Sequence, residues 1–240
     1  MQPKMPRVFL FDSMRVLAII MMIAYHFCYD LKYFGWTSWQ IPGGDGWRYW
    51  RYVIVSLFVF TMGASMGMAT AAGRNYGAFY KRLGKIAGCA LLITFMSLIM
   101  FRQSWIYFGI LHFMVLASCV VFVLSRVSWI VNLTLGISIL LGFALGWLPR
   151  RWPFDYMSGL PVYTEDFVPL FPWLGVACLG LAIGQWILSS PILLTKLSQI
   201  RRDDGLGSAV TFSGKRSLLI YMVHQPILFA ILILTGWIIK

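Results

Sequence analysis

Charged side chains are scarce in this sequence. Lys, Arg, Asp and Glu together make up 12% of the 240 residues, whereas hydrophobic residues make up 60%. A soluble domain has roughly a quarter of its residues charged and about half apolar. This composition excludes an ordinary soluble domain and indicates an integral membrane protein. The aromatic share of 17% fits bilayer interfaces, where Trp and Tyr keep one end hydrated.

Acidic residues are the scarcer charge, with 8 Asp and Glu against 20 Lys and Arg and a formal net charge of +12. In a soluble protein this excess would point to nucleic acid as a partner. In a membrane protein it is explained by the Lys and Arg that accumulate in cytoplasmic loops. We therefore expect a lipid bilayer as a partner, and no nucleic acid.

The sequence has only four cysteines, Cys28, Cys89, Cys119 and Cys178. All lie in apolar runs without CxxC spacing, so we expect buried hydrophobic side chains rather than disulfides or zinc ligands, and no metal site. The weakly basic N-terminus leads into an apolar run that contains Arg15 and lacks an A-x-A-like cleavage site. This pattern predicts an uncleaved first span.

Long apolar runs predict the fold. A membrane-spanning helix needs about 20 mostly apolar residues, and no internal repeat or boundary divides the apolar segments of this chain. We predict an all-α, polytopic membrane helix bundle of about seven transmembrane helices, forming a single domain over residues 1–240. The predicted spans are residues 10–31, 50–72, 82–101, 105–125, 128–148, 168–188 and 216–238. The connection 189–215 is Ser-, Gly- and charge-bearing, which predicts a mobile surface loop.

The distribution of Lys and Arg orients this bundle. With seven spans and the N-terminus inside, thirteen of the 20 basic residues lie on the inner side, which supports an N-in, C-out topology. The inner set is Lys4, Arg7, Arg15, Arg74, Lys81, Arg82, Lys85, Arg126, Lys196, Arg201, Arg202, Lys215 and Arg216. The outer set is Lys32, Arg48, Arg51, Arg102, Arg150, Arg151 and Lys240.

Four ionisable residues share one face of the first span. Asp12, Arg15, His26 and Asp30 are separated by 3, 11 and 4 residues, and eleven residues are close to three helical turns. Asp12 and Arg15 can form a local ion pair near the inner end, and Asp30 can be hydrated near the outer interface. His26 lies well inside the span, where ionisable residues mark function. A carboxylate one turn away predicts that Asp30 orients His26 as a general base.

The other two histidines also lie in predicted spans. His112, in YFGILHFM, is expected at about the depth of His26, and either function or a hydrogen bond to a backbone carbonyl would explain it. His224 precedes Gln225 and Pro226 in the last span. Because proline lacks an N–H, Pro226 frees the carbonyl of Met222 and predicts a kink with a polar pocket.

Three functions fit buried histidines of this kind. Two imidazoles can ligate haem in a helical bundle, which a Soret band would reveal. A stripe of His and Asp can carry protons or a small solute in a transporter. The same groups can catalyse a reaction on a substrate that is reached from the membrane.

Several segments together resemble one known family. FDSMRVLAIIMMIAYHFCYDL, LFVFTMGASMGM and RLGKIAGCALLI are similar to the first three helices of membrane proteins grouped with the catalytic domain of heparan-alpha-glucosaminide N-acetyltransferase. FGILHFMVLAS, FVPLFPWLGVACLGLAIG and GKRSLLIYMVHQPIL resemble the bacterial branch of that family. These segments occur in the family's order and cover most of the chain.

The resemblance implies a transmembrane acetyltransferase that moves an acetyl group from cytoplasmic acetyl-CoA to a sugar amine or hydroxyl on the outer side. On this view the protein is a multi-pass protein of the bacterial inner membrane, and acyl-CoA and a sugar-type acceptor are its partners. For this activity we expect His26, Asp30 and His112 to be the catalytic residues, because they are the ionisable groups inside the predicted spans. The residues expected to contact acetyl-CoA are Arg15, Arg82, Lys85, His224 and Gln225.

The sequence departs from the lysosomal member of that family at one point. The proposed catalytic histidine of the lysosomal enzyme follows the first helix, whereas the comparable segment FGWTSWQIPGG has none, and an asparagine stands in the lysosomal enzyme where this chain has His26. An acetyl-histidine intermediate is therefore left open. The acceptor, the acyl chain length and the oligomeric state, including a homodimer, are open as well. The aromatic outer connections fit sugar rings and the lipid interface equally.

Overall fold

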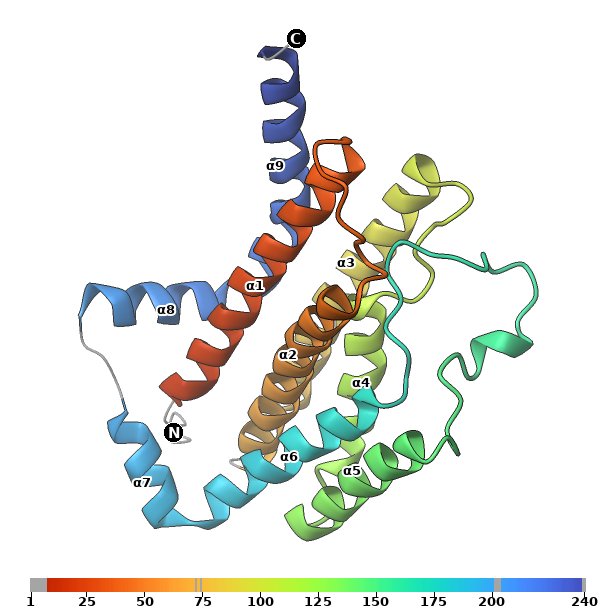
Figure 1. Ribbon diagram of the computed structural model, residues 1–240. Coiled ribbons are helices and arrows are strands. Elements are labelled where there is room, and N and C mark those ends of the chain that lie inside the picture. Colours follow the sequence, from red (N-terminus) through yellow and green to blue (C-terminus); the bar gives the residue numbers. More distant parts are fainter. Residues whose placement is uncertain (1–7, 72, 74, 201–203, 239–240) are drawn as a thin grey trace. The chain divides into compact units, whose positions relative to one another are not determined.

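The computed structural model describes residues 8–71, 73, 75–200 and 204–238, and these residues form helices joined by loops (Figure 1). The predicted all-α membrane fold is confirmed. The described part of the chain contains no strand and nine α-helices. These are α1 Phe9–Tyr33, α2 Asp45–Ala71, α3 Tyr76–Met100, α4 Ile110–Leu124, α5 Trp129–Ala144, α6 Trp173–Ser189, α7 Pro191–Gln199, α8 Gly205–Lys215 and α9 Ser217–Ile238, with one 3₁₀ turn, η1 Phe154–Tyr156.

Four of these helices, α1, α2, α3 and α9, are long and apolar enough to cross a membrane. A fifth span is possible if α6 and α7, which meet at a bend of 101°, are counted as one. α4 and α5 are apolar but have only 15 and 16 residues, which is about 22–24 Å at 1.5 Å per residue. The predicted count of seven spans and the N-in orientation stay predictions. Lys4, Arg7, Arg74, Arg201, Arg202 and Lys240, which entered the orientation argument, lie outside the described residues.

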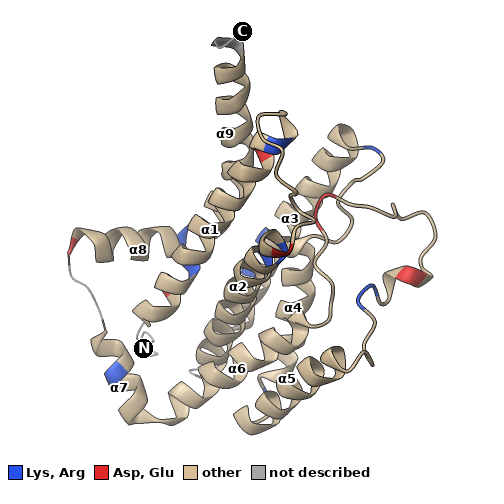
Figure 2. Cartoon of the chain, in the orientation of Figure 1, with Lys and Arg blue, Asp and Glu red and all other residues tan. Residues whose placement is uncertain are grey.

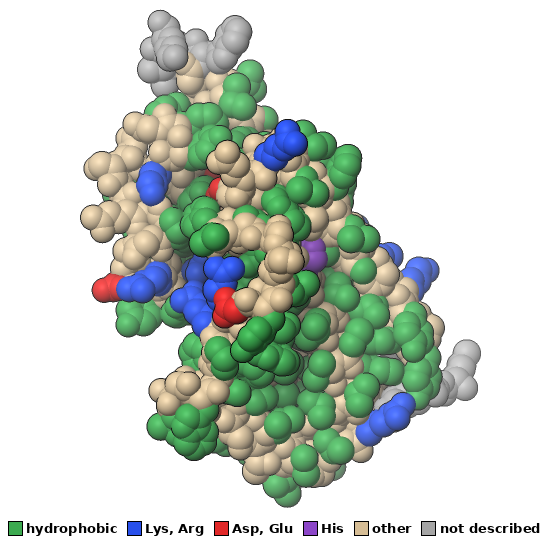
Figure 3. Space-filling view, turned by 90° about the vertical axis from the view of Figure 1, so that its right-hand side faces the viewer, with side chains coloured by type: hydrophobic (Ala, Val, Ile, Leu, Met, Phe, Trp, Pro, Cys, Tyr) green, Lys and Arg blue, Asp and Glu red, His purple; other side chains and the backbone are tan. Residues whose placement is uncertain are grey.

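The surface agrees with a membrane environment. Hydrophobic side chains are spread over the whole face drawn in Figure 3 and far outnumber the charged ones there. Leu91, Phe95 and Ile99 on α3 are each more than 60% exposed. Charged side chains are confined to few positions in Figure 2, and the segments of α4, α5, α6 and α9 contain none. Apolar helices with exposed apolar faces require lipid around them.

The prediction of a mobile loop over 189–215 was wrong, because α7 and α8 occupy most of it. Pro191 is the first residue of α7, a position where its missing N–H costs nothing. Asp204 precedes α8, and its carboxylate accepts a hydrogen bond from the Gly207 N–H at 2.8 Å. These helix starts outweigh the Gly and Ser content that indicated a loop.

The described residues divide into two compact units. The central unit comprises Val59–Lys196. The terminal unit comprises the described residues of Arg7–Phe58 and Leu197–Lys240, which come from the two ends of the chain. α2 begins in the terminal unit and ends in the central unit. The prediction of one acyltransferase-like domain over 1–240 stays a prediction.

In the central unit, glycines allow α2 and α6 to touch backbone to backbone. A Cβ at Gly67 would lie 2.5 Å from the carbonyl oxygen of Leu181, and one at Gly184 would lie 3.0 Å from the Cα of Ala64. Gly63 and Gly180 lie equally close to the opposite helix. Small residues four apart permit such close packing of helices in membranes.

The terminal unit joins helices from the N-terminal and C-terminal parts of the chain. α8 and α9 pack against α1 (Figure 1), and the unit has a core of Met22, Tyr25, Ile41 and Ile54. The segment between α1 and α2 folds back onto this core, where Lys32 Nζ donates a hydrogen bond to the Ile41 carbonyl. This arrangement brings the predicted site residues of the first and last spans together.

Candidate active site

A pair of histidines lies at the contact between α1 and α9. The imidazole rings of His26 and His224 are 4.9 Å apart between centroids and meet at 62°. His224 is buried and His26 is half-buried. The sequence predicted functions for these residues separately, and the structure brings them into one layer of the terminal unit.

A carboxylate and an amide complete this layer. Gln225 Nε2 donates a hydrogen bond of 2.7 Å to Asp30 Oδ1, and the Asp30 side chain is fully buried. We expected Asp30 to orient His26, but among the described residues its hydrogen bond comes from Gln225. We name His26, Asp30, His224 and Gln225 the polar layer.

The position of the His224 proton follows from one contact. His224 Nδ1 lies 2.6 Å from the carbonyl oxygen of Tyr221, one turn earlier in α9. A carbonyl oxygen only accepts hydrogen bonds, so Nδ1 carries the hydrogen and Nε2 of the neutral ring carries a lone pair. An imidazole held in this tautomer is prepared to take a proton at Nε2.

Three atoms of the polar layer are buried with no hydrogen-bond partner in the described part of the chain. They are Asp30 Oδ2, His224 Nε2 and Gln225 Oε1. Buried polar atoms without a partner are rare in folded proteins, and each requires a water or a ligand. All three atoms offer lone pairs, so the layer is built to receive hydrogen-bond donors.

An aromatic wall stands beside the polar layer in the same unit. Trp47 and Trp50, one turn apart in α2, stack at 5.5 Å with an angle of 11° between their planes. Tyr25 packs edge-on against both rings and against His26, with a centroid distance of 5.9 Å to the histidine. Among the described residues, Trp50 Nε1 is a buried donor without a partner. Sequence reasoning missed this donor, because nothing in the sequence distinguishes Trp50 from the other ten Trp residues as a buried and unpaired one.

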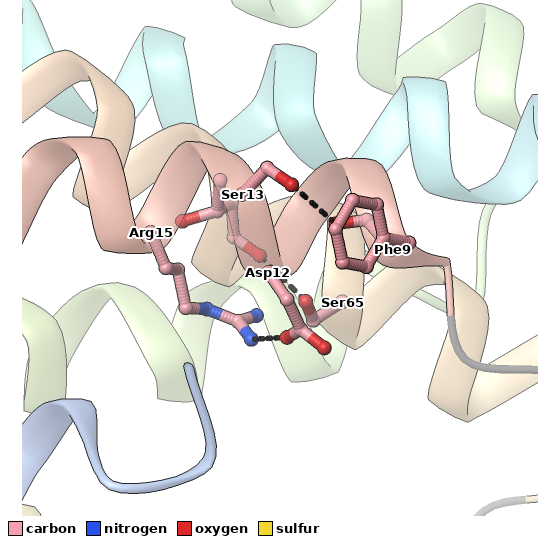
Figure 4. Close-up of polar contacts among 6 residues, drawn as sticks. Phe9, Asp12, Ser13, Arg15 and Ser65 are labelled. Carbon is pink, nitrogen blue, oxygen red and sulfur yellow. Dashed lines mark hydrogen bonds and ion pairs between the residues drawn. The ribbon is translucent and has the colours of Figure 1, made fainter. Parts of the chain in front are cut away.

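The N-terminal end of α1 carries the predicted ion pair. Arg15 Nη1 lies 3.2 Å from Asp12 Oδ1 (Figure 4), and Asp12 is buried. A Cβ at Gly214 of α8 would lie 3.1 Å from the Asp12 side chain, so the glycine permits this contact. Lys215 and Arg216 follow, and Figure 2 shows basic side chains where α8 meets α1. The expected contact of Arg15 with acetyl-CoA stays a prediction.

His112 lies in the central unit and caps a helix. Its Nδ1 accepts a hydrogen bond of 3.3 Å from the Gly109 N–H, and its Nε2 lies 2.9 Å from Thr94 Oγ1. The Thr94 hydroxyl donates to the Ile106 carbonyl at 2.8 Å, so Nε2–H is the donor to Thr94. Both ring nitrogens are thus engaged at the start of α4, and the predicted catalytic role of His112 stays a prediction.

Arg82 and Lys85, the remaining predicted acetyl-CoA contacts, are exposed on α3 of the central unit. Their role also stays a prediction. Among the described residues, no group of three or more His, Cys, Asp and Glu side chains is placed to hold a metal ion.

Comparison with known proteins identifies the family. No curated protein and no solved structure matches the chain. The family model described as heparan-alpha-glucosaminide N-acetyltransferase, catalytic, matches residues 7–226, which include the polar layer and nearly all of the described helices. This chain therefore belongs to the heparan-alpha-glucosaminide N-acetyltransferase catalytic family and is a multi-pass membrane protein.

Proposed function

We propose that this protein transfers an acetyl group from acetyl-CoA to an amine or hydroxyl acceptor, and that the polar layer of the terminal unit is the reaction site. The observation that carries the proposal is the buried lone pair of His224 Nε2, fixed by the Tyr221 carbonyl and next to a second imidazole. Membership of an acetyltransferase family supports the reaction class.

The reaction needs one base and one proton donor. The N–H or O–H bond of the acceptor breaks as its proton passes to His224 Nε2, and the acceptor atom bonds to the thioester carbonyl carbon. The C–S bond then breaks, and the proton passes to the sulfur of CoA. His26 lies beside His224 and relays this proton. The sequence put the base at His26; we assign it to His224 because its tautomer is defined by a hydrogen bond.

The two substrates approach from opposite sides in this proposal. Acetyl-CoA comes from the cytoplasm of a bacterium, and basic side chains hold its phosphates, with Arg15 as the assigned residue of the terminal unit. The acceptor, a sugar-type amine or hydroxyl, comes from the outer side of the inner membrane. The second N–H of the Gln225 amide, beside the one that it donates to Asp30, would donate a hydrogen bond to the thioester oxygen as negative charge develops there.

The test is acetyl transfer by the purified full chain in proteoliposomes, with glucosamine as the acceptor and release of the CoA thiol as the readout. Because general base catalysis contributes roughly 10²–10⁴-fold, His224→Asn and His26→Asn should each lower kcat/KM at least about 100-fold. Thr235→Val is the matched control, since this hydroxyl lies on the same helix and, within the described part of the chain, donates to backbone carbonyls of its own preceding turn. Near-normal transfer by His224→Asn would remove the assignment.

A further inference from the structure

Resting on the proposed function, we infer that Asp30 and Gln225 select the acceptor, and that the site takes molecules with a second hydrogen-bond donor on the atom next to the nucleophile. Such molecules are amino alcohols and vicinal diols. Amines or alcohols with a single donor, and acceptors with an anionic group at that position, are poor substrates.

A hydrogen bond holds the side chains of Asp30 and Gln225 in one arrangement. The 2.7 Å hydrogen bond joins α1 to α9 across 195 residues of sequence. It fixes one carboxylate oxygen and the amide nitrogen, and so leaves Asp30 Oδ2 and Gln225 Oε1 as the open oxygens of the pair. Two buried acceptor oxygens without a partner, on side chains joined by a hydrogen bond, fit a donor group of a ligand.

The lone pair of His224 Nε2 belongs to the residue next to Gln225 in the chain. Gln225 follows His224 directly in α9, and His26 is one turn before Asp30 in α1, with the two imidazoles 4.9 Å apart. Once the nucleophilic N–H or O–H points at His224 Nε2, the oxygens of Asp30 and Gln225 remain for a different donor. A substrate with a single donor would leave these buried oxygens unpaired, which sites of this kind penalise strongly.

The charge of the polar layer also restricts which acceptors can bind. Apart from Gln225, the described groups in the polar layer are the carboxylate of Asp30 and two imidazoles, and its three open atoms are all acceptors. A carboxylate or phosphate next to the nucleophile would bring lone pairs against lone pairs. A hydroxyl or ammonium group there would donate to Asp30 Oδ2 and Gln225 Oε1.

The experiment uses two acceptors that differ by one hydroxyl, trans-2-aminocyclohexanol and cyclohexylamine. Rates are compared at equal concentrations of the neutral amine, since the two amines differ in basicity. The wild-type protein should prefer the amino alcohol by about 10- to 100-fold in kcat/KM, the effect of losing one hydrogen bond to a charged group. Gln225→Met, which keeps the length of the side chain, should reduce this preference to within about 3-fold.

The ratio separates selection from a merely structural effect, because a packing defect lowers both rates together and leaves the ratio unchanged. Gln103→Met makes the same chemical change at an exposed loop position and should keep the wild-type ratio. A wild-type ratio near one, or an unchanged ratio in Gln225→Met, overturns the inference. If the wild-type protein acetylates both amines equally well, the inference fails but the proposed function stands.

A binding measurement covers the case in which Gln225→Met does not fold or the wild type transfers no acetyl group. Thermal unfolding of the purified wild-type protein is followed with each amine alone. A larger rise in Tm with the amino alcohol supports the inference even if the proposed function fails. Equal Tm shifts, or none with either amine, would indicate that water fills the open acceptor sites and would overturn it.

Discussion

At the residue scale, two histidines predicted from the same kind of pattern have different surroundings. His224 keeps an open lone pair at Nε2, whereas both nitrogens of His112 are used at the start of α4. The sequence could not separate them, because each is a lone histidine in an apolar helix. Only the partners, Tyr221 for one and Gly109 with Thr94 for the other, distinguish a base from a cap.

His112→Ala should therefore destabilise the protein more than it alters chemistry. The loss of two hydrogen bonds at a helix start is expected to cost about 1–2 kcal/mol, which lowers the Tm by several degrees. Thr94→Val should cost a similar amount, and the double variant should cost less than the two together because they share one contact. The measurement is thermal unfolding in detergent.

Turnover by His112→Ala, measured well below its Tm, decides the catalytic prediction for this residue. A loss of 100-fold or more in the folded variant would show that His112 takes part in the reaction despite its capping contacts. A loss that follows stability alone would leave it as a helix cap.

The partner of Asp30 shows how far sequence reasoning extends at this scale. The i, i+4 spacing in one helix placed His26 and Asp30 on the same face, and in the structure both meet residues of α9. The kink and polar pocket predicted at Pro226 stay predictions. The spacing could not reveal that Gln225, 195 residues away, would take the carboxylate. Contacts within a helix can be read from its periodicity, whereas contacts between helices depend on how they pack.

At the element scale, apolar runs located seven helices close to their observed positions, because helix is the structure that satisfies backbone groups in lipid. The starts of α7 and α8 were missed, since their composition resembles a loop. The close contact of α2 with α6 was also not predicted, although Gly63, Gly67, Gly180 and Gly184 are spaced four apart in each pair.

This contact gives a stability prediction with a matched control. Gly180→Ala should destabilise the protein by about 2 kcal/mol or more, because the added methyl would meet the backbone of Phe60 and Ala64 in a contact that cannot adjust easily. Gly84→Ala, in α3, meets nothing within 4 Å and should be neutral or stabilising by up to about 1 kcal/mol.

Thermal unfolding of both glycine variants in the same detergent measures the difference. Equal stabilities for Gly180→Ala and Gly84→Ala would show that the α2–α6 contact is not tight. Helix content by circular dichroism at low temperature confirms that each variant is folded before heating.

At the scale of the whole molecule, the orientation does not depend on whether the short pair α4 and α5 crosses the bilayer. If both helices cross and the bent pair α6–α7 counts as one span, there are seven passes, and if α4 and α5 do not cross, α1, α2, α3, α9 and that pair give five. Both numbers are odd, so an N-terminus inside requires a C-terminus outside in either case. The turn between α4 and α5 is the place where the two possibilities differ.

Single cysteines, introduced into a variant that lacks the four native cysteines, can show on which side of the membrane that turn lies. With seven passes, Arg126→Cys should be labelled by a membrane-impermeant maleimide only from the cytoplasmic side. Ser208→Cys in α8 serves as the inner control and Gln103→Cys as the outer one. Labelling of Arg126→Cys from outside would show that α4 and α5 do not cross, which their lengths of about 22–24 Å against a hydrocarbon core of about 30 Å would explain.

The hydrogen bond from His224 Nδ1 to Tyr221 has a consequence for a covalent route. If Nε2 attacked the thioester while Nδ1 kept its hydrogen, the product would be an acylimidazolium, which carries a positive charge and gives up its acyl group far more readily than a neutral acylimidazole. Such a species would be consumed as soon as it formed. Acid quenching with radiolabelled acetyl-CoA should therefore trap no acetylated protein during turnover, and stable label on the α9 peptide would show that the Tyr221 contact opens during the cycle.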